Sequence, residues 1–215
     1  MLNSSIIKQW QMPLHAQWQS LPEQAANTRL NYSSGGALGF INLRGLVGDP
    51  AFVEAVASVL ACALPTEPKG MVYAQEAAVC WQSPDEWTLI CAYGVKDRLL
   101  SQLQLALKGV HAQVVDNSGG LMMLRIHGSD AATVLRHLSP YPILSIQKGR
   151  CVQTIGKKTP FLICCIDQGD YALIFRRSFA EYLWKILDKT ARPYGFSLQK
   201  KWAIEEENWQ RYTQP

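Results

Sequence analysis

Long apolar runs are missing from this chain of 215 residues. No stretch approaches the ~20 consecutive apolar residues that a membrane-spanning helix needs. Residues 1–24 are interrupted by Lys8, His15 and Glu23, so they lack the apolar core of a secretory signal peptide. We therefore expect a soluble, cytoplasmic protein with no membrane partner.

Charge is also scarce, at 18% charged residues and a net charge of +4. Basic pairs occur at Lys157-Lys158, Arg176-Arg177 and Lys200-Lys201, but no run of five or more basic residues is present. A nucleic-acid surface usually shows a strongly basic patch. The pairs favour solvated surface over a phosphate or RNA site, and we expect no nucleic-acid partner.

The sequence contains no C-x-x-C pair among its six cysteines. Five of them lie in apolar, strand-like surroundings and one ends a helical run, which favours small buried side chains in a reducing compartment. They are Cys62, Cys80, Cys91, Cys151, Cys164 and Cys165.

Motifs for metals and nucleotides are absent too. There is no H-E-x-x-H, although His111 and His127 could lie on neighbouring strands, and no glycine-rich phosphate loop. Ser33–Gly36 and Ser118–Gly120 predict a linker and a hairpin turn instead. We expect no metal and no cofactor in this chain.

Two sites invite a catalytic interpretation. Cys151 follows Lys148-Gly-Arg150, and basic neighbours can lower a thiol pKa, but no base lies at a recognisable spacing. Asp85-Glu86 could act as acid and base, but Ser83-Pro84-Asp85-Glu86 is typical of a turn, and adjacent side chains tend to point apart. We expect a structural thiol, a turn and no catalytic residue.

What the sequence does contain is 48% apolar residues arranged in a regular order of elements. Ala37–Arg44 predicts a strand, Asp49-Pro50 the start of a helix, and Ser178 with Glu181 a capping box before the last helix. The order of strand, helix, strands and helix then occurs twice. This indicates an α+β protein of two similar halves, each a mainly antiparallel sheet with two helices.

The predicted organisation has four parts. An N-terminal arm with little regular structure covers residues 1–36, the first α+β half 37–110, the second half 111–195 and a polar C-terminal tail 196–215. The tryptophans of the two arms should be covered, because each can bury ~150–250 Å². They dock either on this chain's core or in a partner interface, where tryptophan often dominates binding; they are Trp10, Trp18, Trp202 and Trp209.

Four segments, in their order and spacing, resemble the gamma subunit of heterotetrameric sarcosine oxidase. They are Leu43–Phe52, Trp81–Trp87, Val115–Ser118 and Arg177–Trp184, with Ser83 in place of the family's usual Gly or Ala. The stretch from Asp116 to Leu135 also resembles the folate-binding fold of aminomethyltransferases. The family-motif residues are Arg44, Asp85, Glu86, Trp87, Asp116, Ser118, Arg177, Ser178 and Trp184.

This resemblance implies a non-catalytic structural or assembly subunit whose chief partner is the large alpha subunit. FAD, FMN, NAD and zinc are then expected in the partner subunits, with tetrahydrofolate as the one-carbon acceptor. The whole complex would oxidise sarcosine to glycine and produce hydrogen peroxide.

Three alternatives remain. One is the matching subunit of an N-methylglutamate dehydrogenase-type complex. Another is a free-standing folate-binding protein related to iron–sulfur maintenance factors, of whose Lys-Gly-Cys-Tyr-x-Gly-Gln-Glu motif Lys148–Thr154 is a partial echo. The third is an RNA-binding module, against which stands the strand Phe161–Ile166, apolar on both faces.

Overall fold

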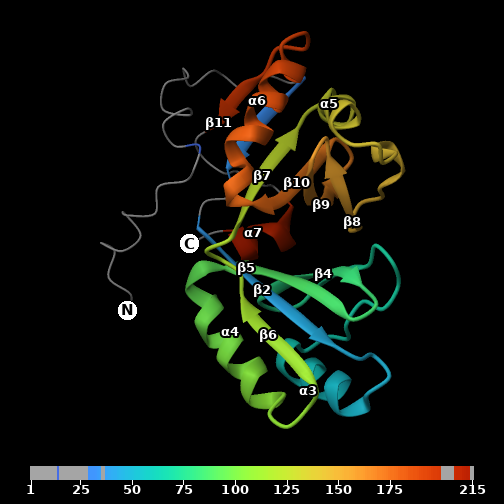
Figure 1. The fold of residues 1–215 in the computed structure, drawn as a ribbon, viewed down its shortest axis with the longest axis vertical. Coiled ribbons are helices and arrows are strands. Elements are labelled where there is room, and N and C mark those ends of the chain that lie inside the picture. The colour runs from blue at the N-terminus through green and yellow to red at the C-terminus, as the bar shows by residue number, and fades with distance from the viewer. Residues whose placement is uncertain (1–13, 15–28, 35–36, 200–205, 214–215) are drawn as a thin grey trace.

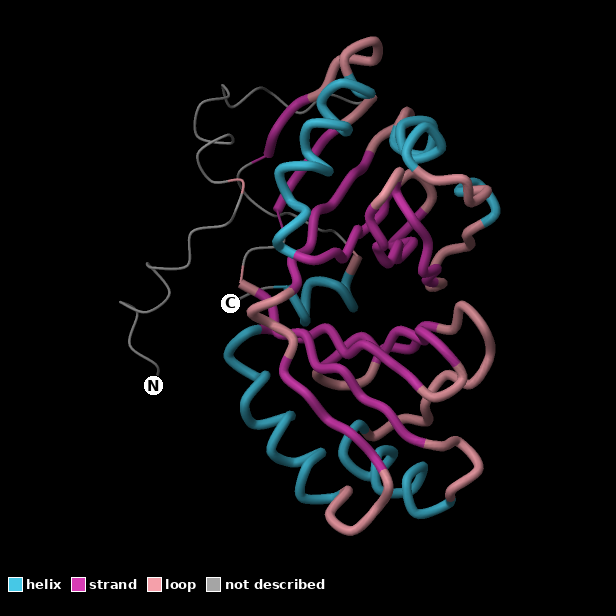
Figure 2. Tube along the Cα trace, in the orientation of Figure 1, coloured by secondary structure: helices cyan, strands magenta, loops and turns pink. Residues whose placement is uncertain are grey.

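The structure, a computed structural model, describes residues 14, 29–34, 37–199 and 206–213. They form two β-sheets, each with helices on one face, as the ribbon in Figure 1 and the trace in Figure 2 show. The predicted α+β class with two mainly antiparallel sheets is confirmed. Three buried apolar clusters result: one under each pair of helices and one between the sheets.

The first sheet has five strands in the order β3-β4-β5-β2-β6, all antiparallel to their neighbours. Helices α3 (Pro50–Leu60) and α4 (Tyr93–Ala106) cover one face. Asp49 caps α3 as predicted, because its side chain accepts a hydrogen bond from the Ala51 N–H at 3.0 Å. The strands are β2 (Leu38–Gly45), β3 (Met71–Tyr73), β4 (Ala77–Ser83), β5 (Glu86–Ala92) and β6 (Ala112–Asp116).

The second sheet has six strands in the order β11-β1-β7-β10-β9-β8. All pairs are antiparallel except β1 with β11. Its helices are α5 (Ala131–Leu138) and α6 (Ala180–Ala191), with 3-10 turns η1 (Ile143–Ser145) and η2 (Arg177–Phe179). The strands are β1 (Asn31–Ser34), β7 (Leu121–His127), β8 (Cys151–Gly156), β9 (Thr159–Asp167), β10 (Asp170–Arg176) and β11 (Ser197–Gln199).

The predicted lack of regular structure in the N-terminal arm is wrong for residues 31–34. β1 lies inside the second sheet between β11 and β7, and its four residues are all buried. The C-terminal tail contributes β11 and helix α7 (Glu207–Thr213). The polar sequence of β1 does not predict a strand. The strand forms because its backbone groups pair with β7 and β11, which come from distant parts of the chain. The predicted boundaries of the two halves, residues 37–110 and 111–195, stay predictions.

Two local predictions also fail. The Ser178–Glu181 capping box does not form, since Arg177–Phe179 makes a 3-10 turn and α6 starts at Ala180 without a side-chain cap. The turn at Ser118–Gly120 is not a hairpin, because it carries the chain from β6 in the first sheet to β7 in the second.

Helix α7 fills space between the sheets (Figure 2). Trp209 and Tyr212 are fully buried in the apolar cluster to which both sheets contribute. Trp209 Nε1 donates to the Tyr73 hydroxyl at 3.1 Å, and the Tyr212 hydroxyl donates to the Ala74 carbonyl. Trp209 therefore docks on its own chain; Trp10, Trp18 and Trp202 lie outside the described residues.

Replacing Trp209 with Ala is expected to lower the free energy of unfolding by about 3–5 kcal/mol, because it empties the aromatic site between the sheets. Urea unfolding followed by circular dichroism measures the change. The control Glu207→Ala removes an exposed ion pair with Arg211 on the same helix and should cost less than about 0.5 kcal/mol. Equal losses in the two variants would contradict the role of Trp209.

Candidate functional site

The family-motif residues fall into three separate places rather than one site. At the β4–β5 turn, Arg44 Nη2 contacts Asp85 Oδ2 at 2.8 Å, and Ser83 Oγ donates to Asp85 at 2.6 Å. Hydrogen bonds from Ser83 and then Arg44 hold the pKa of Asp85 below its ordinary value. Buried Trp87 donates its indole N–H to the Pro65 carbonyl at 2.8 Å. These contacts pin the turn to the first half, so the predicted turn is confirmed.

The second place is the crossing between the two sheets. Ser118 Oγ accepts a hydrogen bond from the Phe40 N–H at 2.9 Å, and the Ser118 N–H donates to Asp116 Oδ1 at 2.8 Å. Asp116 also pairs with Lys96, whose side chain is only 8% exposed. This network ties β2 and α4 to the connection that leads into the second sheet.

The Lys96–Asp116 pair shifts both titrations. Partial burial of Asp116 opposes ionisation, but hydrogen bonds from Lys96 and Ser118 outweigh it and lower the pKa of the carboxyl. Burial likewise opposes the charge on Lys96, but hydrogen bonds to Asp116 and Asp97 raise the pKa of this ammonium. Both groups therefore stay charged across the physiological range.

The third place supports the second sheet. The Arg177 N–H donates to the Gly120 carbonyl at 2.9 Å, which joins η2 to the crossing. Ser178 lies in the same 3-10 turn. Trp184 packs edge-to-face on Tyr32 of β1 at 5.5 Å between ring centroids. These residues connect α6 to the sheet beneath it.

A cleft of about 260 Å³ between the sheets is the candidate binding site. Its first-sheet wall is polar: Asn42 Nδ2 donates to Glu86 Oε1 at 2.7 Å, and Gln82 Nε2 donates to Thr88 Oγ1 at 3.2 Å. The second sheet contributes mainly apolar side chains, with Gln153 and Arg176 at the margin. The second-sheet lining is Leu121, Gln153, Pro160, Phe161, Leu162, Ile174, Phe175 and Arg176.

Of the predicted residues, only Glu86 reaches this cleft; Asn42, Gln82 and Thr88 were missed. A signal for them exists in the two-residue period of a strand. Leu38 and Phe40 face the second sheet, so the same alternation carries Asn42 to that face. The arrangement offers hydrogen bonds and one carboxylate to a small polar molecule. Its volume lies below the ~300–1,000 Å³ of ordinary ligand pockets.

Three of the six thiols, those of Cys80, Cys151 and Cys164, lie in the layer between the sheets. Cys80 Sγ and Cys164 Sγ are 3.7 Å apart, and Cys151 Sγ donates to the Gly70 carbonyl at 3.3 Å. A hydrogen bond with Cys80 and then burial raise the pKa of Cys151 far above its ordinary value. Its basic neighbours do not compensate, and a thiol buried in this way fits the predicted structural role of Cys151.

Among the described residues, no group of three or more His, Cys, Asp or Glu side chains could hold a metal ion. His111 and His127 do not lie on neighbouring strands: His111 precedes β6 of the first sheet, whereas His127 ends β7 of the second. None of the described helices is long and apolar enough to cross a membrane.

The three motif sites lie within one stretch that known proteins share. A sequence model of the sarcosine oxidase gamma subunit family matches residues 44–192, which include every motif residue from Arg44 to Trp184. The chain belongs to the sarcosine oxidase gamma subunit family. It is 33% identical over 107 residues to sarcosine oxidase subunit gamma of Corynebacterium sp. strain U-96, covering 49% of this chain and 51% of that protein. The alignment thus spans about half the length of that curated relative.

Solved structures share the fold of this gamma-family chain. A chain of heterotetrameric sarcosine oxidase from Corynebacterium sp. U-96, in complex with pyrrole 2-carboxylate, matches with a TM-score of 0.78 and 23% identity. That match covers 90% of this chain and 98% of the other. Aminomethyltransferase T of the glycine cleavage system from Bartonella henselae matches with a TM-score of 0.65 and 15% identity, over 86% of this chain and 58% of that one. The predicted aminomethyltransferase-like fold is confirmed.

The buried thiols of this gamma-family chain should resist labelling. In native buffer, Ellman's reagent is expected to react first with Cys62, the one cysteine of the six that is not fully buried. All six should react in guanidinium. Mass spectrometry locates the label, and rapid native labelling of Cys151 would contradict its assignment as a structural thiol.

Asp116→Asn should reduce the acid sensitivity of the fold. A carboxylate with a lowered folded pKa stabilises the native state above its unfolded pKa, and this contribution is lost as pH falls through the folded pKa. At neutral pH the free energy of unfolding of the variant should be about 1 kcal/mol below that of the wild type. Between about pH 7 and about pH 3 it should then fall by less than that of the wild type. Urea unfolding at both pH values measures this.

The control for the acid experiment is Glu54→Gln, which neutralises an exposed carboxylate on α3. It should follow the wild-type pH dependence. If Asp116→Asn does the same, the Lys96–Asp116 pair has no part in acid stability.

Proposed function

We propose that this chain is a non-catalytic assembly subunit of a heterotetrameric sarcosine oxidase. In this proposal the complex oxidises sarcosine to glycine, passes the one-carbon unit to tetrahydrofolate and produces hydrogen peroxide. The large alpha subunit is the chief partner, and FAD, FMN, NAD and zinc belong to the other subunits. The free thiols of the chain fit a cytoplasmic setting.

The filling of the space between the two halves carries this proposal. Trp209 and Tyr212 occupy that space together with apolar side chains from both sheets. A ligand the size of a pterin with its side arm would have to displace α7 or widen the remaining cleft of about 260 Å³. The structure thus uses its inter-sheet space for its own packing.

The family motifs support the same conclusion. Arg44 and Asp85 bond to each other, Asp116 and Ser118 bond to the sheet crossing, and Trp184 packs in the core. Each of these side chains has a partner within the chain, and none is aimed with a second reactive group into the cleft. Their contacts account for them as parts of a scaffold.

Co-expression with the other oxidase subunits tests the proposal. A tag on this chain is expected to recover the large subunit with its bound flavin, and the recovered complex should release hydrogen peroxide from sarcosine. A tag that recovers this chain alone would overturn the assembly role. Turnover of N-methylglutamate in place of sarcosine would assign the chain to the related dehydrogenase-type complex.

The isolated chain provides the complementary measurement. Calorimetric titration with tetrahydrofolate should release no heat of binding, because α7 and the core occupy the space between the sheets. Tight folate binding that Asn42→Ala or Glu86→Gln weakens would identify the cleft as a folate site. That outcome would favour the free-standing folate-binding alternative.

A further inference from the structure

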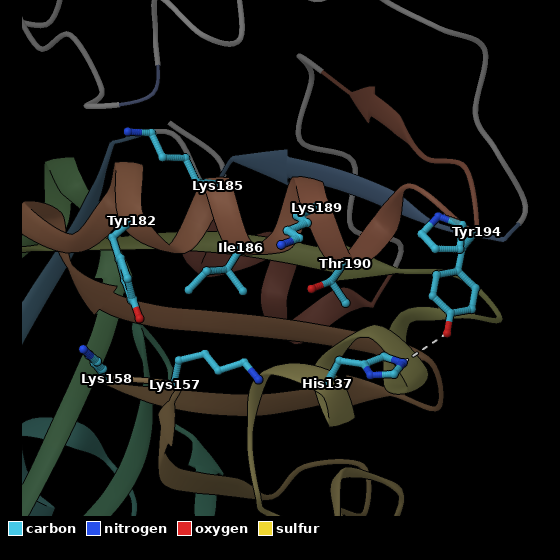
Figure 3. A pocket seen from close by; sticks show the side chains of 10 residues that line it. His137, Lys157, Lys158, Tyr182, Lys185, Ile186, Lys189, Thr190 and Tyr194 are labelled. Atoms are coloured by element: carbon cyan, nitrogen blue, oxygen red, sulfur yellow. Dashed lines mark hydrogen bonds between the residues drawn. The ribbon is translucent and has the colours of Figure 1, made fainter.

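A groove of about 1080 Å³ lies apart from the inter-sheet cleft. α6 forms one wall, and the turn between β8 and β9 forms the other (Figure 3). His137 of α5 and Tyr194 close one end, with His137 Nε2 at 3.2 Å from the Tyr194 hydroxyl. None of these side chains takes part in the contacts described for the family motifs.

The lining of the groove is apolar along α6. Tyr182 and Ile186 point from the helix toward Lys157 on the opposite wall (Figure 3). They are four residues apart, so they share one stripe of the helix. The core-facing stripe contains Leu183 and Leu187, which are buried. Tyr182 is 36% exposed, whereas Ile186 is half-buried and packs against the core of the second sheet. The described part of the chain therefore leaves the Tyr182 end of this stripe exposed in the groove.

Four exposed lysines line this groove, although the amine of Lys185 points away from the β8–β9 turn (Figure 3). Lys157 and Lys158 stand on the β8–β9 turn, and Lys185 and Lys189 stand on α6. Within residues 14, 29–34, 37–199 and 206–213, none of the four forms an ion pair. The nearby carboxylate of Asp188 is already engaged by Arg192 at 2.9 Å. The groove therefore presents uncompensated positive charge beside apolar surface.

We infer that this groove docks an acidic segment of a partner subunit that inserts an aliphatic or aromatic side chain between α6 and the β8–β9 turn. The inference rests on the proposed function and identifies a contact surface for it. Carboxylates would pair with the lysines while the apolar side chain covers Tyr182 and Ile186. Charged rims of this kind steer association and select the partner, and the apolar contact supplies affinity.

Size and charge favour this occupant over others. The groove is far larger than a small inorganic anion needs, and such an anion would make no contact with its apolar side chains. The N-terminal residues of this chain do not complement the lysines, because residues 1–28 contain one acidic residue, Glu23, and one basic residue, Lys8. A protein segment with several carboxylates and an apolar anchor matches both features.

The test uses the assembled complex and a carbodiimide, which joins lysine amines to carboxylates without a spacer. Mass spectrometry should find cross-links from Lys157, Lys158, Lys185 or Lys189 to Asp or Glu of another subunit. The variant Lys157→Glu/Lys189→Glu reverses one charge on each wall. It should weaken assembly at least about tenfold at moderate ionic strength, because like charges then meet across the contact.

The matched control is Lys69→Glu/Lys108→Glu, which makes the same change in charge at two exposed lysines outside the groove. It should assemble like the wild type. If assembly weakens equally in both variants, the change in net charge explains the effect, and the inference is overturned. A groove variant that assembles as well as the wild type would also overturn the inference. That outcome would leave the proposed function unaffected.

The remaining outcomes separate the two proposals. If the wild type itself fails to recover any subunit, the assembly role is wrong and the groove has no partner of this kind. A second outcome is that the wild type binds heparin or a single-stranded oligonucleotide, the groove variant does not, and assembly of the variant is unchanged. The occupant is then a polyanion, and the inference is overturned. Circular dichroism of each variant confirms that it folds.

Discussion

Trp209 and Tyr212 lie between two sheets that are otherwise built from separate stretches of chain, and much of the structure depends on that contact. Helix α7, which carries them, belongs to neither sheet, yet it contacts Tyr73 and Ala74 of the first half and shares an apolar cluster with Met123 of the second. Both sheets present apolar side chains to this layer, so leaving it open would expose them to water. Packing α7 there joins the halves into one core and uses the space a ligand would need.

The chain also crosses between the sheets, and its polar contacts concentrate at such a crossing. Ser118 and Asp116 satisfy backbone groups where the chain leaves the first sheet, and Lys96 neutralises the carboxylate. A second link joins the sheet edges, because the Cys151 N–H donates to the Lys69 carbonyl at 3.1 Å. Buried backbone groups that leave a sheet must find partners elsewhere, and Asp116 and Ser118 provide them at this crossing.

The inter-sheet cleft and the groove beside α6 differ in kind. The inter-sheet cleft is small, with a hydrogen-bonded polar wall, whereas the groove beside α6 is larger, apolar along one wall and surrounded by unpaired lysines. Under the proposed assembly role, other subunits would bind outward-facing surface of the second kind. α6 buries Leu183 and Leu187 in the core while Tyr182 stays exposed in the groove.

Local patterns in the sequence were enough for the α+β class, the alternating strands, the Asp49 cap and the turn at Asp85, because each depends on residues close together in the chain. The motifs from Arg44 to Trp184 were enough for the family. Tertiary structure alone decided that polar Asn31–Ser34 is a buried strand, that Trp209 fills the space between the sheets, and that Lys157 faces α6 across a groove. Each of these depends on segments far apart in sequence, and local residue preferences carry no information about which distant surfaces will meet.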